Sequence, residues 1–153
     1  MKKPYLILVA DSSLAIRTLI SDVLTDEHYT VFCCQQQWAT VDAIERLRPD
    51  LLILELHHVN LAAIFLLLHQ LRQRSTTQAI PMLAISTDAP LLNRLAHPLG
   101  QFNCATLGKP FDLDQLLASV AQALNPQVYA EFPAATYKSL TSEPTGYSAP
   151  PAT

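Results

Sequence analysis

The chain has 153 residues, of which half are hydrophobic and 15% are charged, with a net charge of -3 and a pI near 5.9. This composition is typical of a globular domain with a buried core and excludes a largely disordered chain. Because the net charge is slightly negative and no basic cluster occurs, nucleic acid and anionic membrane surfaces are disfavoured as partners.

The sequence also argues against membrane insertion and secretion. No apolar run approaches the roughly 20 residues that span a bilayer, and the run at residues 5–10 is too short for the core of a signal peptide. The cysteines Cys33, Cys34 and Cys104 fit reduced thiols better than a disulfide framework. We therefore expect a cytoplasmic protein.

Strand-like and helix-like segments alternate from residue 5 to about residue 125, which is the pattern of an α/β fold with a parallel sheet. The predicted strands are short apolar runs, and the predicted helices repeat apolar residues every three or four positions. In chain order the predicted elements are strand 5–10, a helix capped by Ser12 or Ser13, strand 29–34, helix 38–47, strand 51–54, helix 61–72, strand 80–86, helix 90–96, strand 104–107 and a helix capped by Asp112.

Prolines set several of the predicted boundaries. Helix 90–96 is expected to stop before Pro98 and Gly100, because proline cannot donate the backbone hydrogen bond that a helix needs. After the last helix the chain becomes rich in Pro, Ser, Thr and Ala, without an apolar period. We predict a domain at residues 1–125 and a Pro-rich, flexible tail at residues 126–153.

Polar side chains follow several of the predicted strands. Asp11 and Ser12 come directly after the first strand, Glu55 ends the third, Ser86 ends the fourth and Lys109 follows the fifth. Because the carboxyl ends of parallel strands meet at one edge of the sheet, we expect these residues to lie together.

These residues, with the run Leu107-Gly108-Lys109-Pro110-Phe111, resemble the receiver domain of two-component response regulators, the CheY-like superfamily. The resemblance covers about the first four-fifths of the chain. It implies a flavodoxin-like (βα)5 fold, in which a doubly wound, five-stranded parallel sheet has the strand order 2-1-3-4-5. It also implies a site where two acids, an acceptor aspartate, a Ser or Thr and a lysine meet.

At the centre of the site two positions depart from the family pattern, so the chain resembles a degenerate pseudo-receiver. Ser12 stands where the second acid usually ligates Mg²⁺, and Glu55 stands at the position of the phosphoryl-accepting aspartate. The extra methylene of glutamate moves the carboxylate by about 1.5 Å, which disfavours in-line phosphoryl transfer. We expect no cofactor, with weak Mg²⁺ binding through Asp11 and Glu55 left open.

At the other positions of the family site, this chain has only some of the residue types that the family has. The resemblance implies that Ser86 is the hydroxyl switch, followed by Thr87, that Thr106 replaces an aromatic switch, and that the bond before Pro110 is cis. It also makes Lys109 the partner of the acceptor carboxylate.

Two uses of Glu55 follow from this resemblance. We expect a structural pair between Glu55 and Lys109. A second hypothesis is that Glu55 supplies a fixed, phosphate-mimicking charge.

Other site chemistries are weaker. His57 and His58 could suggest a transition-metal site, but adjacent histidines generally point apart and no further Cys or His spacing supports it. A small-molecule site or an enzyme would need a Gly-rich phosphate loop near the first strand, and none occurs there.

Helix 61–72 carries more apolar residues than one sheet-facing stripe needs. Either the Pro-rich tail covers this helix or it forms an interface with another chain, and of these two readings we favour a dimer or partner contact. The candidate interface residues are Ile64, Phe65, Leu66 and Leu67.

We therefore expect an atypical stand-alone receiver that is not an enzyme and acts in signal transduction by phosphorylation-independent protein–protein interaction. Its partner would be a signalling protein, such as a histidine kinase or a regulatory protein, or a second copy of the chain. The alternative is a working two-component response regulator that a histidine kinase phosphorylates at an unusual acceptor.

Overall fold

The computed structural model describes residues 3–126, and the predicted tail lies outside the described residues except for Pro126. The helices and strands alternate along this part of the chain. They are β1 (Leu6–Ala10), α1 (Leu14–Asp26), β2 (Thr30–Cys34), α2 (Val41–Leu47), β3 (Leu51–Glu55), α3 (Leu61–Gln73), β4 (Met82–Ser86), α4 (Ala89–Gln101), β5 (Cys104–Gly108) and α5 (Leu113–Leu124).

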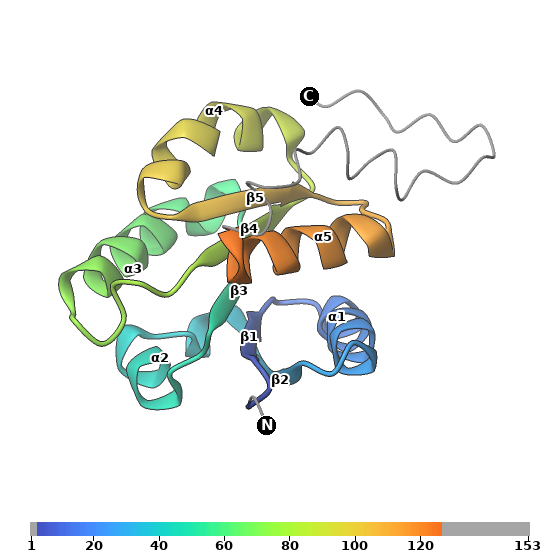
Figure 1. The fold of residues 1–153 in the computed structure, drawn as a ribbon. Coiled ribbons are helices and arrows are strands. Elements are labelled where there is room, and N and C mark those ends of the chain that lie inside the picture. The colour runs from blue at the N-terminus through green and yellow to red at the C-terminus, as the bar shows by residue number, and fades with distance from the viewer. Residues whose placement is uncertain (1–2, 127–153) are drawn as a thin grey trace.

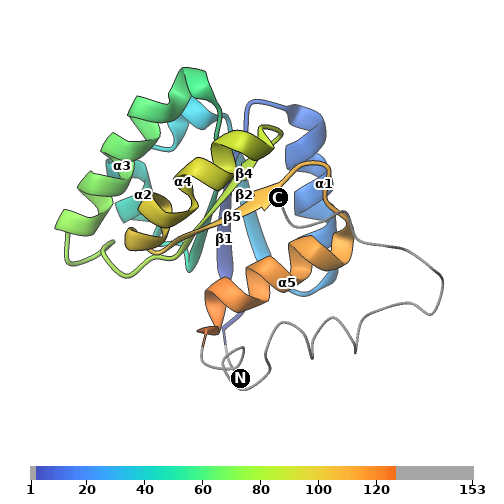
Figure 2. The same ribbon diagram turned by 90° about the horizontal axis from the view of Figure 1, so that it is seen from above.

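The strands form one parallel sheet in the order β2-β1-β3-β4-β5, which confirms the predicted fold class and strand order. Helices α1 and α5 cover one face of the sheet, and α2, α3 and α4 cover the other (Figures 1 and 2). No helix within residues 3–126 has the length and apolar character to cross a membrane.

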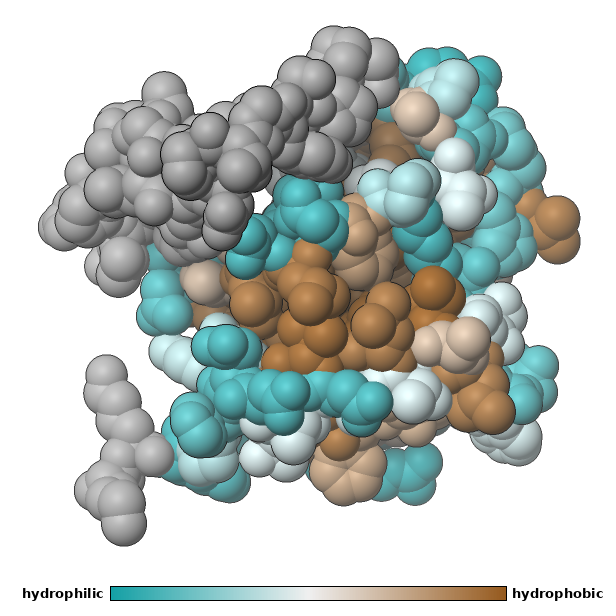
Figure 3. Space-filling view, turned by 90° about the vertical axis from the view of Figure 1, so that its right-hand side faces the viewer, coloured by the Kyte–Doolittle hydropathy of each residue, from teal (hydrophilic) through white to brown (hydrophobic). Residues whose placement is uncertain are grey.

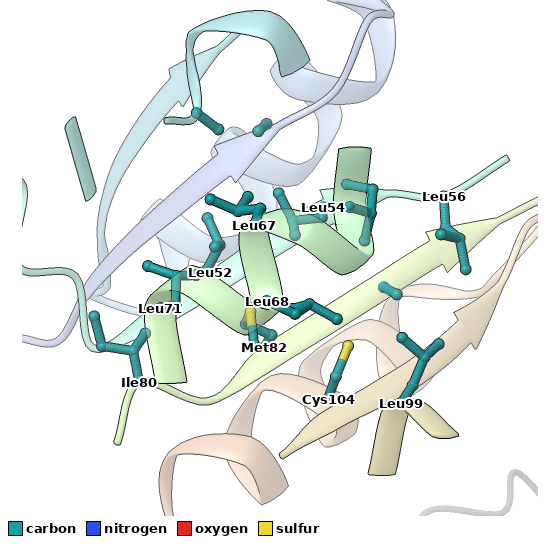
Figure 4. Close-up of a cluster of buried hydrophobic side chains, with 14 of the residues drawn as sticks. Leu52, Leu54, Leu56, Leu67, Leu68, Leu71, Ile80, Met82, Leu99 and Cys104 are labelled. Carbon is teal, nitrogen blue, oxygen red and sulfur yellow. The ribbon is translucent and has the colours of Figure 1, made fainter. Parts of the chain in front are cut away.

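The central strands β1, β3 and β4 are apolar up to the last residues of β3 and β4, because both of their faces are buried. In β3, Leu51 and Ile53 face the core beneath α1 and α5, whereas Leu52 and Leu54 face the core beneath α2, α3 and α4. Figure 4 shows part of the second core, where leucines of α3 meet side chains of β3 and β4. This burial holds the strand ends, and therefore the site, in place.

Most of the additional apolar residues of α3 are part of the core. Ile64 and Leu67 are only 3% and 8% exposed, and Phe65 packs edge-on against Phe102 at a ring-centroid distance of 6.1 Å. Helix α3 lies between α2 and α4 (Figure 1), so it buries more than one stripe. The predicted interface is therefore wrong for Ile64 and Leu67, and Leu66 is the exposed member of the predicted set, at 58%.

Two helix boundaries differ from the prediction. Trp38 lies in a separate 3₁₀ turn, and α2 begins after Thr40, whose hydroxyl accepts a hydrogen bond from the backbone amide of Ala43. Helix α4 continues through Pro98 to Gln101. Burial of Leu91, Leu92 and Leu99 on the sheet side of α4 outweighs the hydrogen bond that proline cannot make.

Arg72 joins three segments of the chain through one guanidinium group. It donates hydrogen bonds of 2.6–3.2 Å to the carbonyl oxygens of Thr77, Gln78, Ile80 and Phe102. Burial lowers the pKa of Arg72 from its ordinary value. The planar guanidinium group thus connects α3 to the residues that precede β4 and to the turn before β5.

We predict that Arg72→Lys lowers the free energy of unfolding by roughly 2–4 kcal/mol, because an ammonium group cannot reach all four carbonyls. Urea unfolding measures this. Arg74→Lys is the matched control, since Arg74 makes surface ion pairs with Asp42 and Glu45 and should matter little. Equal losses in the two variants would contradict a special role for Arg72.

Candidate functional site at the carboxyl edge of the sheet

The predicted site residues meet at the carboxyl edge of the sheet. Asp11 follows β1, Glu55 ends β3, Ser86 ends β4 and Lys109 follows β5. The backbone amide of Lys109 donates a hydrogen bond of 2.7 Å to the carbonyl oxygen of Ser86, which holds two of these strand ends together. Asp11 and Ser86 are each only 2% exposed.

Lys109 forms a buried ion pair with Asp11. Its Nζ donates to Asp11 Oδ2 at 3.1 Å, and the two side chains are 11% and 3% exposed. The other carboxylate oxygen of Asp11, Oδ1, accepts a hydrogen bond of 2.8 Å from the backbone amide of Ser13. A buried carboxylate needs both kinds of partner to offset its lost hydration.

Glu55 turns instead toward the loop between β1 and α1. Its Oε2 accepts hydrogen bonds from the backbone amide of Ser12 at 2.9 Å and from the Ser12 hydroxyl at 2.6 Å. The backbone of Glu55 is held on both sides, by Gln36 Oε1 at its amide and by Asn60 Nδ2 at its carbonyl. The contact with Ser12 joins the loop after β1 to the end of β3.

The predicted pair between Glu55 and Lys109 is therefore wrong, because the ammonium of Lys109 bonds to Asp11. Two physical reasons account for the difference. Asp11 is the more deeply buried carboxylate and gains more from a counter-charge. The extra methylene of Glu55 lets its carboxylate reach neutral donors on Ser12.

The pKa of Glu55 is lowered from its ordinary value. Burial by itself would raise this pKa, but the hydroxyl and amide hydrogen bonds from Ser12 outweigh burial, with help from the charges of Lys109 and His57. These hydrogen bonds therefore favour the ionised form of Glu55.

The other predicted positions are Ser86, Thr87, Thr106 and Pro110. The hydroxyl of Ser86 accepts a hydrogen bond of 3.0 Å from the backbone amide two residues later. Thr87 is exposed, and Thr106 lines a cavity at the opposite, amino edge of the sheet. The bond between Lys109 and Pro110 is cis, as the resemblance implied.

One contact beside the site was not predicted. His58 Nε2 lies 2.7 Å from Asp88 Oδ2, which joins the loop after β3 to the loop after β4. Asp88 also caps α4 by accepting a hydrogen bond from the backbone amide of Leu91. An aspartate just before an apolar helix is a sequence signal for the cap, but no sequence pattern indicates the partner His58.

The site offers a poor set of ligands for Mg²⁺. A hard divalent cation takes six or more oxygen ligands and prefers anionic ones. The carboxylates of Asp11 and Glu55 already accept hydrogen bonds from Lys109, Ser13 and Ser12. Within residues 3–126, no group of three or more His, Cys, Asp or Glu side chains is arranged to hold a metal ion.

Sequence comparison relates the chain to bacterial response regulators. It is 31% identical over 145 residues to the response regulators MprA of Mycobacterium sp. strains KMS and JLS, and the match covers 92% of this chain. The chain spans about three fifths of the length of these curated relatives, since the match covers 61% of each of them. No protein-family model matches the chain.

Structural comparison identifies the same fold. The chemotaxis response regulator CheY4 of Vibrio cholerae superposes with a TM-score of 0.67 at 23% identity, covering 80% of this chain and 100% of CheY4. The signal receiver domain of a LuxO repressor protein from Vibrio parahaemolyticus gives a TM-score of 0.69 at 23% identity, covering 84% of this chain and 96% of that domain.

We predict that Lys109→Met lowers the free energy of unfolding by about 3 kcal/mol, because it leaves the Asp11 carboxylate buried without a counter-charge. The double variant Asp11→Asn/Lys109→Met should recover much of this loss. Chemical denaturation of the two variants measures the difference. An equal or larger loss in the double variant would show that the charge pair is not the cause.

We predict that Ser12→Ala raises the pKa of Glu55 and lowers the free energy of unfolding by about 1 kcal/mol at neutral pH. A lowered folded-state pKa stabilises the fold above the unfolded-state pKa, and this stabilisation is lost as pH falls through the folded-state value. The difference from wild type should therefore shrink below about pH 4.

Carboxyl ¹³C titration of Glu55 reports its pKa directly. Ser13→Ala is the matched control, because Ser13 caps α1 through the amide of Ile16 and does not contact Glu55. The control should lose stability without a change in the pKa of Glu55. An unchanged pKa in Ser12→Ala would contradict the assigned role of Ser12.

Proposed function

We propose that this chain, which belongs to the receiver-domain family of response regulators, acts in signal transduction through protein contacts that do not require phosphorylation. The family gives the fold and the general signalling role. The independence from phosphorylation is our inference from the chemistry of the site.

The observation that carries the proposal is the direct contact between Ser12 and Glu55. Two carboxylates at these positions would repel each other and would favour a cation between them. A hydroxyl and an amide donating to one carboxylate need no cation. The site is thus internally satisfied in the absence of Mg²⁺ and of a phosphoryl group.

A second candidate function is that of a working regulator, phosphorylated by a histidine kinase on Glu55. It is favoured by Asp11, Ser86 and Lys109, which stand where the family places them. Phosphorylation would require Glu55 to leave both hydrogen bonds to Ser12 and to align with a phosphoryl donor. In-line transfer depends on close positioning of the nucleophile, so we rank this function second.

The geometry gives less support to a phosphate-mimicking role of Glu55. Such a role would bring the carboxylate to the hydroxyl of Ser86 or to the ammonium of Lys109. The Glu55 carboxylate bonds instead to Ser12, and Lys109 bonds to Asp11.

The partner, the location and the absence of enzymatic activity are parts of the same proposal. We expect a protein of a signalling pathway as the partner, in the cytoplasm, with no nucleic acid or cofactor involved. A receiver domain that does not undergo phosphoryl transfer would signal through a partner-binding surface that is either accessible or inaccessible, which requires no catalytic group.

We predict that amide spectra of the wild-type protein stay unchanged with millimolar Mg²⁺ and then with beryllofluoride, a stand-in for the phosphoryl group. The variant Ser12→Asp/Glu55→Asp should respond to both, because it regains two carboxylates of the family length. Each single variant serves as a control and should respond more weakly than the double variant.

Wild-type shifts concentrated at Asp11, Glu55, Ser86 and Lys109 would overturn the proposal and favour the working regulator. If the double variant alone responds, the two substitutions account for the loss of phosphoryl chemistry.

A further inference from the structure

Strand β2 forms one edge of the sheet and has an open side. It pairs in parallel with β1, and no other strand within residues 3–126 lies beside it (Figure 1). The strand has the sequence Thr-Val-Phe-Cys-Cys, without the charged residue or proline that commonly protects the edge of a sheet. Its outer backbone groups can therefore pair with a further strand.

The hydrogen bonds between β2 and β1 show which backbone groups of β2 lie on the open side. The amide of Thr30 and the carbonyl oxygen of Cys34 bond to residues at the two ends of β1, at 2.9 and 3.2 Å. Because the backbone groups of successive strand residues alternate between the two edges, the amide and carbonyl groups of Val31 and Cys33 point to the open side.

Phe32, in the middle of β2, has an exposed side chain. It is 53% exposed, although Leu8, its neighbour in β1, is only 5% exposed. Leu8 belongs to the core beneath α2, α3 and α4, so Phe32 lies at the margin of that face of the sheet. A strand added on the open side would place a cross-strand side chain against this ring.

The two ends of β2 differ in charge on the α1 side of the sheet. Asp26 and Glu27 are exposed and precede the amino end of β2. At the carboxyl end, Arg17 of α1 donates from its Nη1 to the carbonyl oxygen of Asp11 at 2.6 Å, and Cys33 Sγ lies 3.7 Å from the carbonyl oxygen of Arg17. An antiparallel partner with the same charges would therefore meet opposite charges at both ends.

We propose that two copies of this chain associate through β2, as antiparallel edge strands related by a two-fold axis at Phe32. In this register, Val31 of each copy faces Cys33 of the second copy, so all the outward amide and carbonyl groups are paired across the axis. Phe32 faces the same residue of the second copy, and the two sheets become one continuous sheet.

Self-complementarity favours a second copy over an unrelated strand. A two-fold axis at Val31 or Cys33 would shorten the overlap of the two strands, whereas the axis at Phe32 keeps it complete. The antiparallel direction brings Glu27 of each copy toward Arg17 of the second copy, and a parallel direction would bring like charges together. Because β2 itself has no charged residue, no like charges face each other within the pair.

Another apolar surface lies over α1 and α5 (Figure 3), where Leu19 and Leu113 are 44% and 49% exposed. The backbone groups of a helix are paired within the helix, so this surface specifies neither the backbone form nor the direction of what covers it. The edge of β2 requires an extended strand. It is therefore the surface whose occupant can be inferred from the structure.

This inference goes beyond the function proposed above. Pairing through β2 does not depend on whether Glu55 accepts a phosphoryl group, because the groups that form the pair are backbone groups and the side chain of Phe32.

Sedimentation equilibrium of the full 153-residue chain tests the proposal. A reductant keeps Cys33 and Cys34 as thiols, so that a disulfide cannot mimic the dimer. Protein concentrations from about 10 μM to about 1 mM cover the weak, transient class to which a small interface belongs. The wild-type chain should show a reversible equilibrium between monomer and dimer.

Phe32→Lys and Phe32→Glu should each raise the dissociation constant of the dimer about tenfold or more, because two like charges then face each other across the axis. An equimolar mixture of the two variants should recover the dimer, since lysine then faces glutamate. This recovery also shows that both variants are folded.

Leu66→Lys is the matched control, because Leu66 is 58% exposed on α3, and Leu113→Lys tests the surface over α1 and α5. Both should dimerise like the wild type. A wild-type chain that stays monomeric at every concentration would overturn the proposal. So would a dimer that either control weakens as much as Phe32→Lys does, or a mixture of the two Phe32 variants that does not recover the dimer.

Discussion

The balance of charge at the carboxyl edge of the sheet is the constraint on which the site depends. The fold brings two carboxylates together with one ammonium, and that ammonium can neutralise only one of them at close range. It pairs with Asp11, which is almost fully buried. Glu55 is left to neutral donors, and Ser12 supplies two of them. A second acid at position 12 would face the Glu55 carboxylate directly and would repel it.

The two substitutions at the site therefore support each other. The longer side chain of Glu55 reaches across to the loop after β1, and the short hydroxyl of Ser12 meets it there. Either change alone would leave a carboxylate or a hydroxyl without this partner. The receiver fold remains complete around them, including the cis bond before Pro110 and the placement of Lys109. The fold is therefore kept while the residues at the centre of its site differ from the family pattern.

The two faces of the sheet differ in how completely their helices bury their apolar side chains. Helix α3 is packed between α2 and α4, so its additional apolar residues contribute to the core. Arg72, near the end of α3, donates hydrogen bonds to the segments that follow. The face formed by α1 and α5 has aliphatic side chains that the described residues leave partly exposed. On α3, Leu66 is the large apolar side chain that stays exposed, at 58%.

The α/β class, the parallel sheet and the gathering of Asp11, Glu55 and Lys109 are predictable from the amino-acid sequence, because apolar runs that end in polar residues specify buried strands with a common functional edge. The cap at Asp112 is predictable in the same way, because it is a local signal. The carboxylate that pairs with Lys109 could not be predicted in this way, since the pairing depends on relative burial and on side-chain reach across strands in the folded protein. For the same reason, the path of α4 through Pro98 followed from packing against the sheet, which local propensity does not contain.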